Sequence, residues 1–155
     1  MESVLVLEDD QELRELLVET LQDEGYTVEG VNRAQQAIEM VTSREFDLFV
    51  TDIRMEGMSG LDAVAFLRQR GYNFNVLVIT GFASEKDPIR AIKLGVGEYL
   101  TKPFSLEEFL AVVGRLARQS SQERLRRQTD AELQELVGWF ARRAIELPSV
   151  APDRL

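Results

Sequence analysis

Short apolar runs alternate with helix-like stripes along the first 119 residues of the chain. Five runs have the length of strands, and they cover residues 4–7, 27–31, 48–51, 76–79 and 98–101. After each run, apolar side chains recur every three or four residues, which is the spacing of one helix face. These stripes are Leu13, Leu16, Leu17 and Leu21; Ala34, Ala37, Ile38 and Val41; Leu61, Val64 and Leu67; Ile89 and Ile92; and Phe109, Leu110, Val113 and Leu116. The pattern therefore predicts five strand–helix units in succession.

Local signals at the ends of these elements support the same division. Asp10 is a suitable N-cap for the first helix, and Gly25 is suited to end it. Ser105 and Glu108 have the spacing of a capping box at the start of the fifth helix. The run 27–31 is more polar than the others, which predicts a strand near the edge of the sheet.

Strands that alternate with helices indicate a parallel sheet with helices on both faces. About 119 residues suit an open, doubly wound, flavodoxin-like α/β sheet and are too few for an eight-fold barrel. We therefore predict a five-stranded sheet in the order 2-1-3-4-5, followed by an extra C-terminal helix. In this order a crevice opens between the carboxyl ends of the first and third strands, where such sheets bind ligands.

Residues 120–155 break this pattern, which predicts a domain at 1–119 followed by a linker and a helix. Two serines and three arginines interrupt the apolar spacing: Ser120, Ser121, Arg124, Arg126 and Arg127. Thr129 and Glu132 then offer a second capping box, which predicts a separate amphipathic helix beginning there. Its apolar face is Leu133, Leu136, Val137, Phe140 and Ala144, and Pro148 and Pro152 mark its end.

Something must bury the apolar face of this helix. It folds back on the domain, pairs with a second copy of the chain in a homodimer, or leads into an output domain, and the sequence leaves these three interpretations open. The three arginines indicate a solvated helix face rather than a nucleic-acid contact, because residues 120–155 carry six acidic and six basic side chains.

The composition narrows the chemistry that the chain can perform. Its 155 residues include no cysteine and no histidine. Disulfides, thiolate metal sites, histidine-based catalysis and the usual zinc sites are therefore excluded. Any bound metal must have oxygen ligands, which favours Mg²⁺, Mn²⁺ or Ca²⁺.

The net charge of −9 argues against nonspecific binding of nucleic acid. The opening residues, Met1, Glu2 and Ser3, show no basic stretch followed by an apolar one, so no signal peptide is expected. No apolar run approaches the roughly 20 residues that a membrane helix needs. We expect a soluble, cytoplasmic protein that neither binds nucleic acid through this segment nor contacts a membrane.

Acidic side chains follow two of the predicted strands, and a lysine follows a third. Glu8 and Asp9 come directly after the first run, Asp52 after the third and Lys102 after the fifth. The carboxyl ends of parallel strands meet at one edge, so these four side chains are expected to share a pocket. Clustered carboxylates repel one another unless a cation joins them, which predicts a site for a hard divalent metal.

The same cluster has the parts needed for phosphoryl transfer to a carboxylate. Such a site needs a nucleophile, a metal, a cation and a hydrogen-bond donor for the phosphoryl oxygens. Asp52 is the candidate nucleophile, and Lys102 is the candidate cation. Thr80, at the end of the fourth strand, is the candidate hydroxyl donor, and Gly81 after it leaves the backbone N–H approachable.

Five stretches carry a family resemblance: VLVLEDD at 4–10, DLFVTDIRM at 47–55, GMSGL at 57–61, VITG at 78–81 and YLTKPF at 99–104. Their order and spacing resemble the receiver domain of the bacterial two-component response regulators. The resemblance covers residues 1–119, and it is specific because five stretches agree in register.

The resemblance implies a role for each residue of the cluster. Asp52 matches the aspartate that is phosphorylated by a histidine kinase or a phosphotransfer protein. The ligands implied for Mg²⁺ (or Mn²⁺) are Glu8, Asp9, Asp52 and the backbone carbonyl of Arg54. Lys102 matches the phosphate-contacting lysine, Thr80 and Tyr99 match the moving switch residues, and the peptide bond to Pro103 is expected to be cis.

Three positions depart from the family pattern. The acidic pair is Glu8 and Asp9 rather than two aspartates, which is a variant that the family tolerates. Glu56 stands where a proline is usual, which predicts a looser loop and altered phosphorylation kinetics. Phe82 lies two residues beyond Thr80, where a bulky side chain beside Arg54 is expected to screen attacking water and lengthen the phosphorylated lifetime.

The expected function is a phosphorylation-dependent signalling switch, with no turnover beyond its own phosphoryl transfer and dephosphorylation. One alternative is the receiver part of a longer transcription regulator, and residues 51–55 are reminiscent of receivers that precede an AAA+ ATPase. An alternative from another class is an aspartyl-nucleophile phosphohydrolase. Such enzymes carry a second aspartate two residues after the nucleophile, and Arg54 stands there instead.

Overall fold

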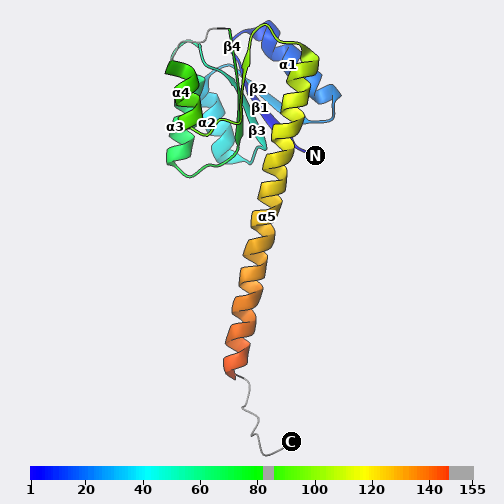
Figure 1. Ribbon diagram of the computed structural model, residues 1–155, viewed down its shortest axis with the longest axis vertical. Helices are drawn as coiled ribbons and strands as arrows, with labels where there is room; N and C mark the ends of the chain where they lie inside the picture. The colour runs from blue at the N-terminus through cyan, green and yellow to red at the C-terminus, as the bar shows by residue number, and fades with distance from the viewer. Residues whose placement is uncertain (82–85, 147–155) are drawn as a thin grey trace, which may run out of the picture. The chain divides into compact units, whose positions relative to one another are not determined.

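Five parallel strands form the centre of the chain in a computed structural model that describes residues 1–81 and 86–146 (Figure 1). The strands are β1 (Ser3–Leu7), β2 (Thr27–Val31), β3 (Leu48–Asp52), β4 (Asn75–Thr80) and β5 (Glu98–Thr101). The helices are α1 (Gln11–Asp23), α2 (Ala34–Ser43), α3 (Gly60–Gln69), α4 (Lys86–Lys93) and α5 (Leu106–Glu146). The chain divides into two compact units, Met1–Ser121 and Gln122–Leu155.

The sheet has the order β2-β1-β3-β4-β5 with all neighbours parallel, so the predicted topology is confirmed. β3 lies at the centre, and all five of its residues are buried. β2 lies at the edge, as its polar sequence predicted. The register pairs Leu7 of β1 with Thr51 of β3, so the two strands end side by side.

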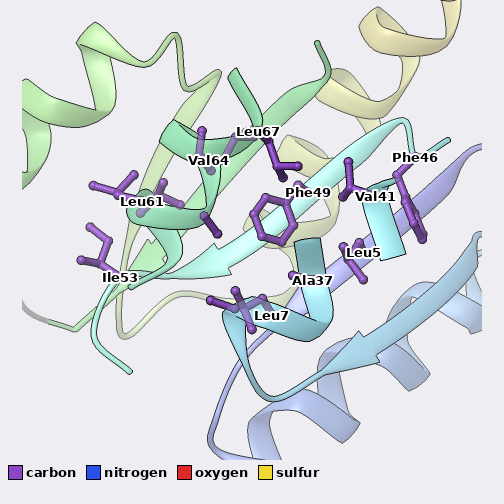
Figure 2. Close-up of a cluster of buried hydrophobic side chains, with 14 of the residues drawn as sticks. Leu5, Leu7, Ala37, Val41, Phe46, Phe49, Ile53, Leu61, Val64 and Leu67 are labelled. Carbon is purple, nitrogen blue, oxygen red and sulfur yellow. The ribbon is translucent and has the colours of Figure 1, made fainter. Parts of the chain in front are cut away.

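Alternate residues of the strands point to opposite faces of the sheet and build two cores. Leu5, Leu7 and Phe49 pack with apolar side chains of α2 and α3 on one face, the cluster that Figure 2 shows. Val6 and Val50 pack with α1 and α5 on the other face. The predicted helix stripes supply most of these contacts, which are made by Leu17, Leu21, Ala34, Ala37, Val41, Leu61, Val64, Leu67, Phe109, Val113 and Leu116.

The expected helix ends are present. The Asp10 side chain accepts a hydrogen bond from the Leu13 N–H at 3.2 Å and caps α1. Gly25 follows α1 with a φ of 95°, which suits glycine. The Ser105 hydroxyl oxygen accepts a hydrogen bond from the Glu108 N–H at 3.0 Å near the start of α5.

Two predicted helix stripes are partly wrong. Leu16 of α1 is exposed, whereas Leu17 and Leu21 are buried. On α4, Ile89 and Ile92 are 57% and 77% exposed, and Ala91 is the residue that enters the core. Only one narrow face of a short helix contacts the sheet. The presence of apolar residues alone does not show which face that is.

The extra C-terminal helix is present, but its predicted separate start at Thr129 is wrong, because α5 runs without a break from Leu106 to Glu146. The Thr129 hydroxyl donates a hydrogen bond to the Leu125 carbonyl at 3.0 Å, as in a helix interior, instead of capping a new helix. Arg127 pairs with Glu123 at 2.8 Å, one turn earlier. The serines and arginines interrupt the apolar spacing but not the helix. Pro148 and Pro152 lie outside the described residues.

Candidate functional site

The acidic cluster forms where β1 and β3 end beside each other. Glu8 directly follows β1, and its N–H donates to the Val31 carbonyl of β2 at 3.1 Å. Asp52 is the last residue of β3. Lys102 directly follows β5, and its N–H donates to the Thr80 carbonyl at the end of β4 at 2.8 Å. The ends of the strands therefore fix the backbone of the site. This agrees with the prediction that these residues lie at one edge of the sheet.

The Lys102 ammonium group joins the two carboxylates. Its Nζ lies 2.7 Å from Asp52 Oδ2 and 3.4 Å from Glu8 Oε2. Glu8 is 1% exposed and Asp52 is 6% exposed, so both carboxylates have lost most of their water. The peptide bond between Lys102 and Pro103 is cis, as expected. The structure thus brings together three of the four residues that the sequence placed in one pocket.

Burial sets the protonation of this cluster. It raises the pKa of Glu8 to about 7, an effect that Lys102 opposes and the charge of Asp52 reinforces. Burial lowers the pKa of Lys102. Its hydrogen bond to Asp52 and the charge of Glu8 together raise this pKa by more, so the net shift is upward. Both shifts therefore reflect burial and the close contact of Lys102 with the two carboxylates.

Asp9 lies apart from this ion pair. Its side chain is exposed and lines a cleft of about 510 Å³ together with Asn32, Glu56 and Met58. Within residues 1–81 and 86–146, no three acidic side chains lie close enough to hold a metal ion. Lys102 stands between Glu8 and Asp52 and contacts both carboxylates.

The donor set nevertheless fits a hard divalent ion. When all three are deprotonated, Glu8, Asp9 and Asp52 carry three negative charges against the one positive charge of Lys102, and the difference equals the charge of Mg²⁺. All the available ligands are oxygens, which Mg²⁺ and Mn²⁺ prefer.

The two predicted switch residues lie on adjacent strands. Thr80 is 1% exposed and pairs in register with Thr101 of β5. Tyr99 is half-buried, and its buried hydroxyl has no hydrogen-bond partner in the part of the chain that the structure describes. Burial raises the pKa of Tyr99, and the charges of Asp87 and Asp52 add to this effect. Phe82 lies outside the described residues.

Three residues support the site that the sequence did not single out for it. The Arg14 guanidinium donates to the Glu8 carbonyl at 2.8 Å, from one turn inside α1. The Thr51 hydroxyl donates to the Asp52 carbonyl at 2.8 Å. Gly60 begins α3 so close to this strand end that a Cβ there would overlap the Thr51 hydroxyl and the Asp52 carbonyl. The sequence signal that could have identified Gly60 was a glycine at the first position of a predicted helix.

The loop after β3 is held to Asp52. The Arg54 N–H donates to Asp52 Oδ1 at 3.2 Å, which leaves Oδ2 on the side of Lys102. Ser59 and Asp62 then form a full capping box that starts α3. These contacts fix both ends of the loop that carries Glu56, although the loop lacks the proline expected in this family.

The comparison with protein families assigns this fold to a known class. The profile described as "Response regulator receiver domain" matches residues 4–114. The chain therefore belongs to the receiver-domain family of two-component response regulators. The resemblance predicted from five short stretches is confirmed.

Curated relatives include two response regulators of known name. The chain is 36% identical over 118 residues to "Two-component response regulator PhoP" of Pseudomonas aeruginosa, covering 76% of this chain and 52% of the relative. It is 37% identical over 120 residues to "Response regulator MprA" of Mycobacterium ulcerans, covering 77% and 52%. The chain thus spans about half the length of the curated relatives it matches.

Solved structures show the same architecture. The chemotaxis protein CheY4 of Vibrio cholerae aligns with a TM-score of 0.69 at 30% identity, over 75% of this chain and 98% of that one. The response regulator TrrA of Thermotoga maritima, solved in complex with Mg²⁺ and BeF, aligns with a TM-score of 0.68 at 29% identity, over 75% and 99%. Over the described residues of this chain, no helix is both long and apolar enough to span a bilayer.

Proposed function

We propose that this protein is a phosphorylation-dependent signalling switch in which Asp52 accepts a phosphoryl group. The observation that carries the proposal is the Lys102 ammonium group, 2.7 Å from Asp52 Oδ2 at the carboxyl edge of the sheet. That position lets Lys102 bind an oxygen of the incoming group while Asp52 attacks phosphorus. The proposed receiver unit is 1–119, and 120–155 is the segment that follows it.

The donor is a phosphohistidine of a histidine kinase or a phosphotransfer protein. An Asp52 carboxylate oxygen forms the new bond to phosphorus as the nitrogen–phosphorus bond of the donor breaks. A bound Mg²⁺ (or Mn²⁺) supplies charge neutralisation for the phosphoryl oxygens. Its proposed ligands are Glu8, Asp9, Asp52 and the carbonyl of Arg54. Lys102 then leaves Glu8 and stays with the phosphoryl group.

Thr80 and Tyr99 convert phosphorylation into a change of shape. The Thr80 hydroxyl turns toward a phosphoryl oxygen, and Tyr99 moves with it. The Tyr99 hydroxyl has no partner among residues 1–81 and 86–146, and an unpaired buried hydroxyl costs about 1–3 kcal/mol, so Tyr99 gains from a rearrangement that provides one. Phosphorylation therefore shifts the balance between two arrangements at α4, β5 and α5.

The output is a contact with another protein, made in the cytoplasm, rather than turnover of a substrate. The family assignment favours this signalling role over an aspartyl-nucleophile phosphohydrolase. The chain matches only about half the length of relatives such as PhoP, which supports the receiver part of a longer transcription regulator as the second candidate. An AAA+ activator is one such regulator.

Hydrogen–deuterium exchange with Mg²⁺ and beryllofluoride tests this switch. We expect slower exchange in the loops that follow β1, β3 and β5 and altered exchange in α4, all absent in Asp52→Asn. Asp47→Asn is the matched control, because the Asp47 carboxylate accepts hydrogen bonds from Ser3 at the opposite end of β3. The proposal is contradicted if the exchange rates do not change with beryllofluoride, or if they change equally in Asp52→Asn.

Replacing Glu8 by glutamine is expected to flatten the pH dependence of stability. The pKa of Glu8 is raised from 4.5 to about 7 in the folded state, so its contribution is fully present below pH 4.5 and is lost as pH rises through about 7. The free energy of unfolding that is lost over this pH range is at most about 3 kcal/mol. Denaturant unfolding between about pH 4 and 8 measures it, with the exposed Glu19→Gln as the control. Equal slopes in Glu8→Gln and wild type would show that another group causes the pH dependence.

A further inference from the structure

The end of α5 presents a stripe of apolar side chains to solvent. Leu133, Val137 and Phe140 are 54%, 66% and 59% exposed, and Leu125, Leu136 and Trp139 are also exposed. All six lie in the second unit, Gln122–Leu155, whose part of α5 runs from yellow to orange in Figure 1. Aromatic and aliphatic side chains in one stripe are typical of a protein interface. We propose that this face pairs with the same face of a second copy, and that the two helices run antiparallel.

The exposed area is sufficient for a dimer. At roughly 100 Å² for each of the five half-exposed side chains between residues 127 and 146, two copies remove about 1,000 Å² from water, which reaches the lower limit of a specific interface. The Trp139 and Phe140 rings pack against each other with centroids 5.0 Å apart, so they offer a preformed anchor. Most of the stability of a helix in a protein comes from packing of its apolar face rather than from propensity, which favours a partner that covers this one.

The charges flanking the stripe favour an antiparallel pair. Glu132 and Arg143 are eleven residues apart, about three turns, and therefore lie on the same flank of the helix. Arg143 stacks on Trp139 with 5.0 Å between guanidinium carbon and ring centroid, which places it beside the stripe. In an antiparallel dimer like flanks face each other. Glu132 then meets Arg143 of the second copy, and the symmetry makes this pair twice.

A parallel pair has the opposite charge pattern. Each flank then faces the other flank of the second copy, which brings Glu132 level with Asp130 across the interface. Two like-charge contacts result, and neither glutamate reaches an arginine at the same level. The apolar stripe is also centred between Leu136 and Val137, so an antiparallel crossing there matches Leu133 with Phe140. The paired segment, residues 127–146, lies entirely within the second unit.

Sedimentation of the whole chain over about 1–100 µM tests the dimer, and a dimer is expected. Leu136→Asp should weaken it at least tenfold, while Glu135→Gln, a change on the opposite face, should leave it unchanged. Glu132→Arg and Arg143→Glu should each weaken the dimer, and their combination should restore it. A monomer throughout the concentration range overturns the proposal, as does a double variant no stronger than the single ones. Far-UV circular dichroism checks that each variant keeps its helix.

Spin labels decide the orientation, because the chain has no cysteine of its own. A label at Gln128→Cys should lie about 25–30 Å from its counterpart along antiparallel helices, but about 10 Å away in a parallel pair. A label at Gln134→Cys, near the centre of the stripe, should give a short distance in either case and serves as the control. A short distance at position 128 overturns the antiparallel arrangement.

Discussion

Replacing Lys102 with alanine is expected to slow the phosphorylation of Asp52 by roughly 100- to 1,000-fold, as when one preorganised stabilising group is removed. The Lys102 ammonium lies 2.7 Å from Asp52 Oδ2 and is the charged donor that contacts both carboxylates. Without it, the negative phosphoryl donor meets Glu8 and Asp52 with no fixed positive charge between them. Phosphorylation rates with a small-molecule donor, measured at saturating Mg²⁺, give the effect directly.

The same substitution is expected to destabilise the fold near pH 8, by up to about 3 kcal/mol, because it leaves two buried carboxylates side by side. The loss should shrink toward pH 5, where Glu8 is protonated. Lys102→Arg keeps the charge and serves as the control, with a smaller loss of both rate and stability. If Lys102→Ala is phosphorylated at the wild-type rate, the proposed role of this ion pair is wrong.

Replacing Gly60 with alanine is expected to destabilise the protein by about 2–3 kcal/mol and to slow phosphorylation as well. A Cβ at Gly60 would overlap the Thr51 hydroxyl and the Asp52 carbonyl, so α3 must move away from the end of β3. The nearest obstacles are the backbone and a buried side chain that donates a hydrogen bond, and neither can swing aside. Denaturant unfolding measures the stability, and phosphorylation kinetics report the displacement of Asp52.

Gly114→Ala is the matched control for this change. Gly114 lies inside α5, and a Cβ there would lie 3.5 Å from the Tyr26 hydroxyl, an ordinary contact. Alanine also has a higher helix propensity than glycine, so we expect Gly114→Ala to be neutral or slightly stabilising. Equal losses in the two variants would mean that glycine content, rather than the close approach of α3 to β3, sets the stability.

The arrangement of Glu8, Asp52 and Lys102 could be predicted from sequence because it depends on backbone topology. A parallel sheet brings the ends of its strands to one edge, and the predicted order 2-1-3-4-5 is a common one for a doubly wound sheet of five strands. The direction of the Asp9 side chain could not be predicted in the same way. It depends on a loop and on the balance of charge around it, which the strand pattern does not contain.

The errors along α4 and α5 have a related cause. The apolar residues Ile89 and Ile92 indicate a helix, but they do not show which face of that helix packs on the sheet. In α5, the spacing of apolar residues is lost between Leu116 and Leu125, and this loss suggested a linker. Helix continuity depends instead on backbone propensity and on local pairs such as Arg127 with Glu123, which persist without an apolar face. Gly60 could not be recognised for a different reason. Its importance comes from a close contact with the end of β3 rather than from its neighbours in the sequence.

The identity of the residue that takes the phosphoryl group tests the central claim most directly. The protein is incubated with acetyl phosphate and Mg²⁺, the acyl phosphate is trapped by borohydride reduction, and the modified peptide is sequenced by mass spectrometry. We predict one modified residue, Asp52, with no label when Mg²⁺ is chelated and none in Asp52→Asn. Modification of another residue, or equal labelling of Asp52→Asn, would contradict the proposed function.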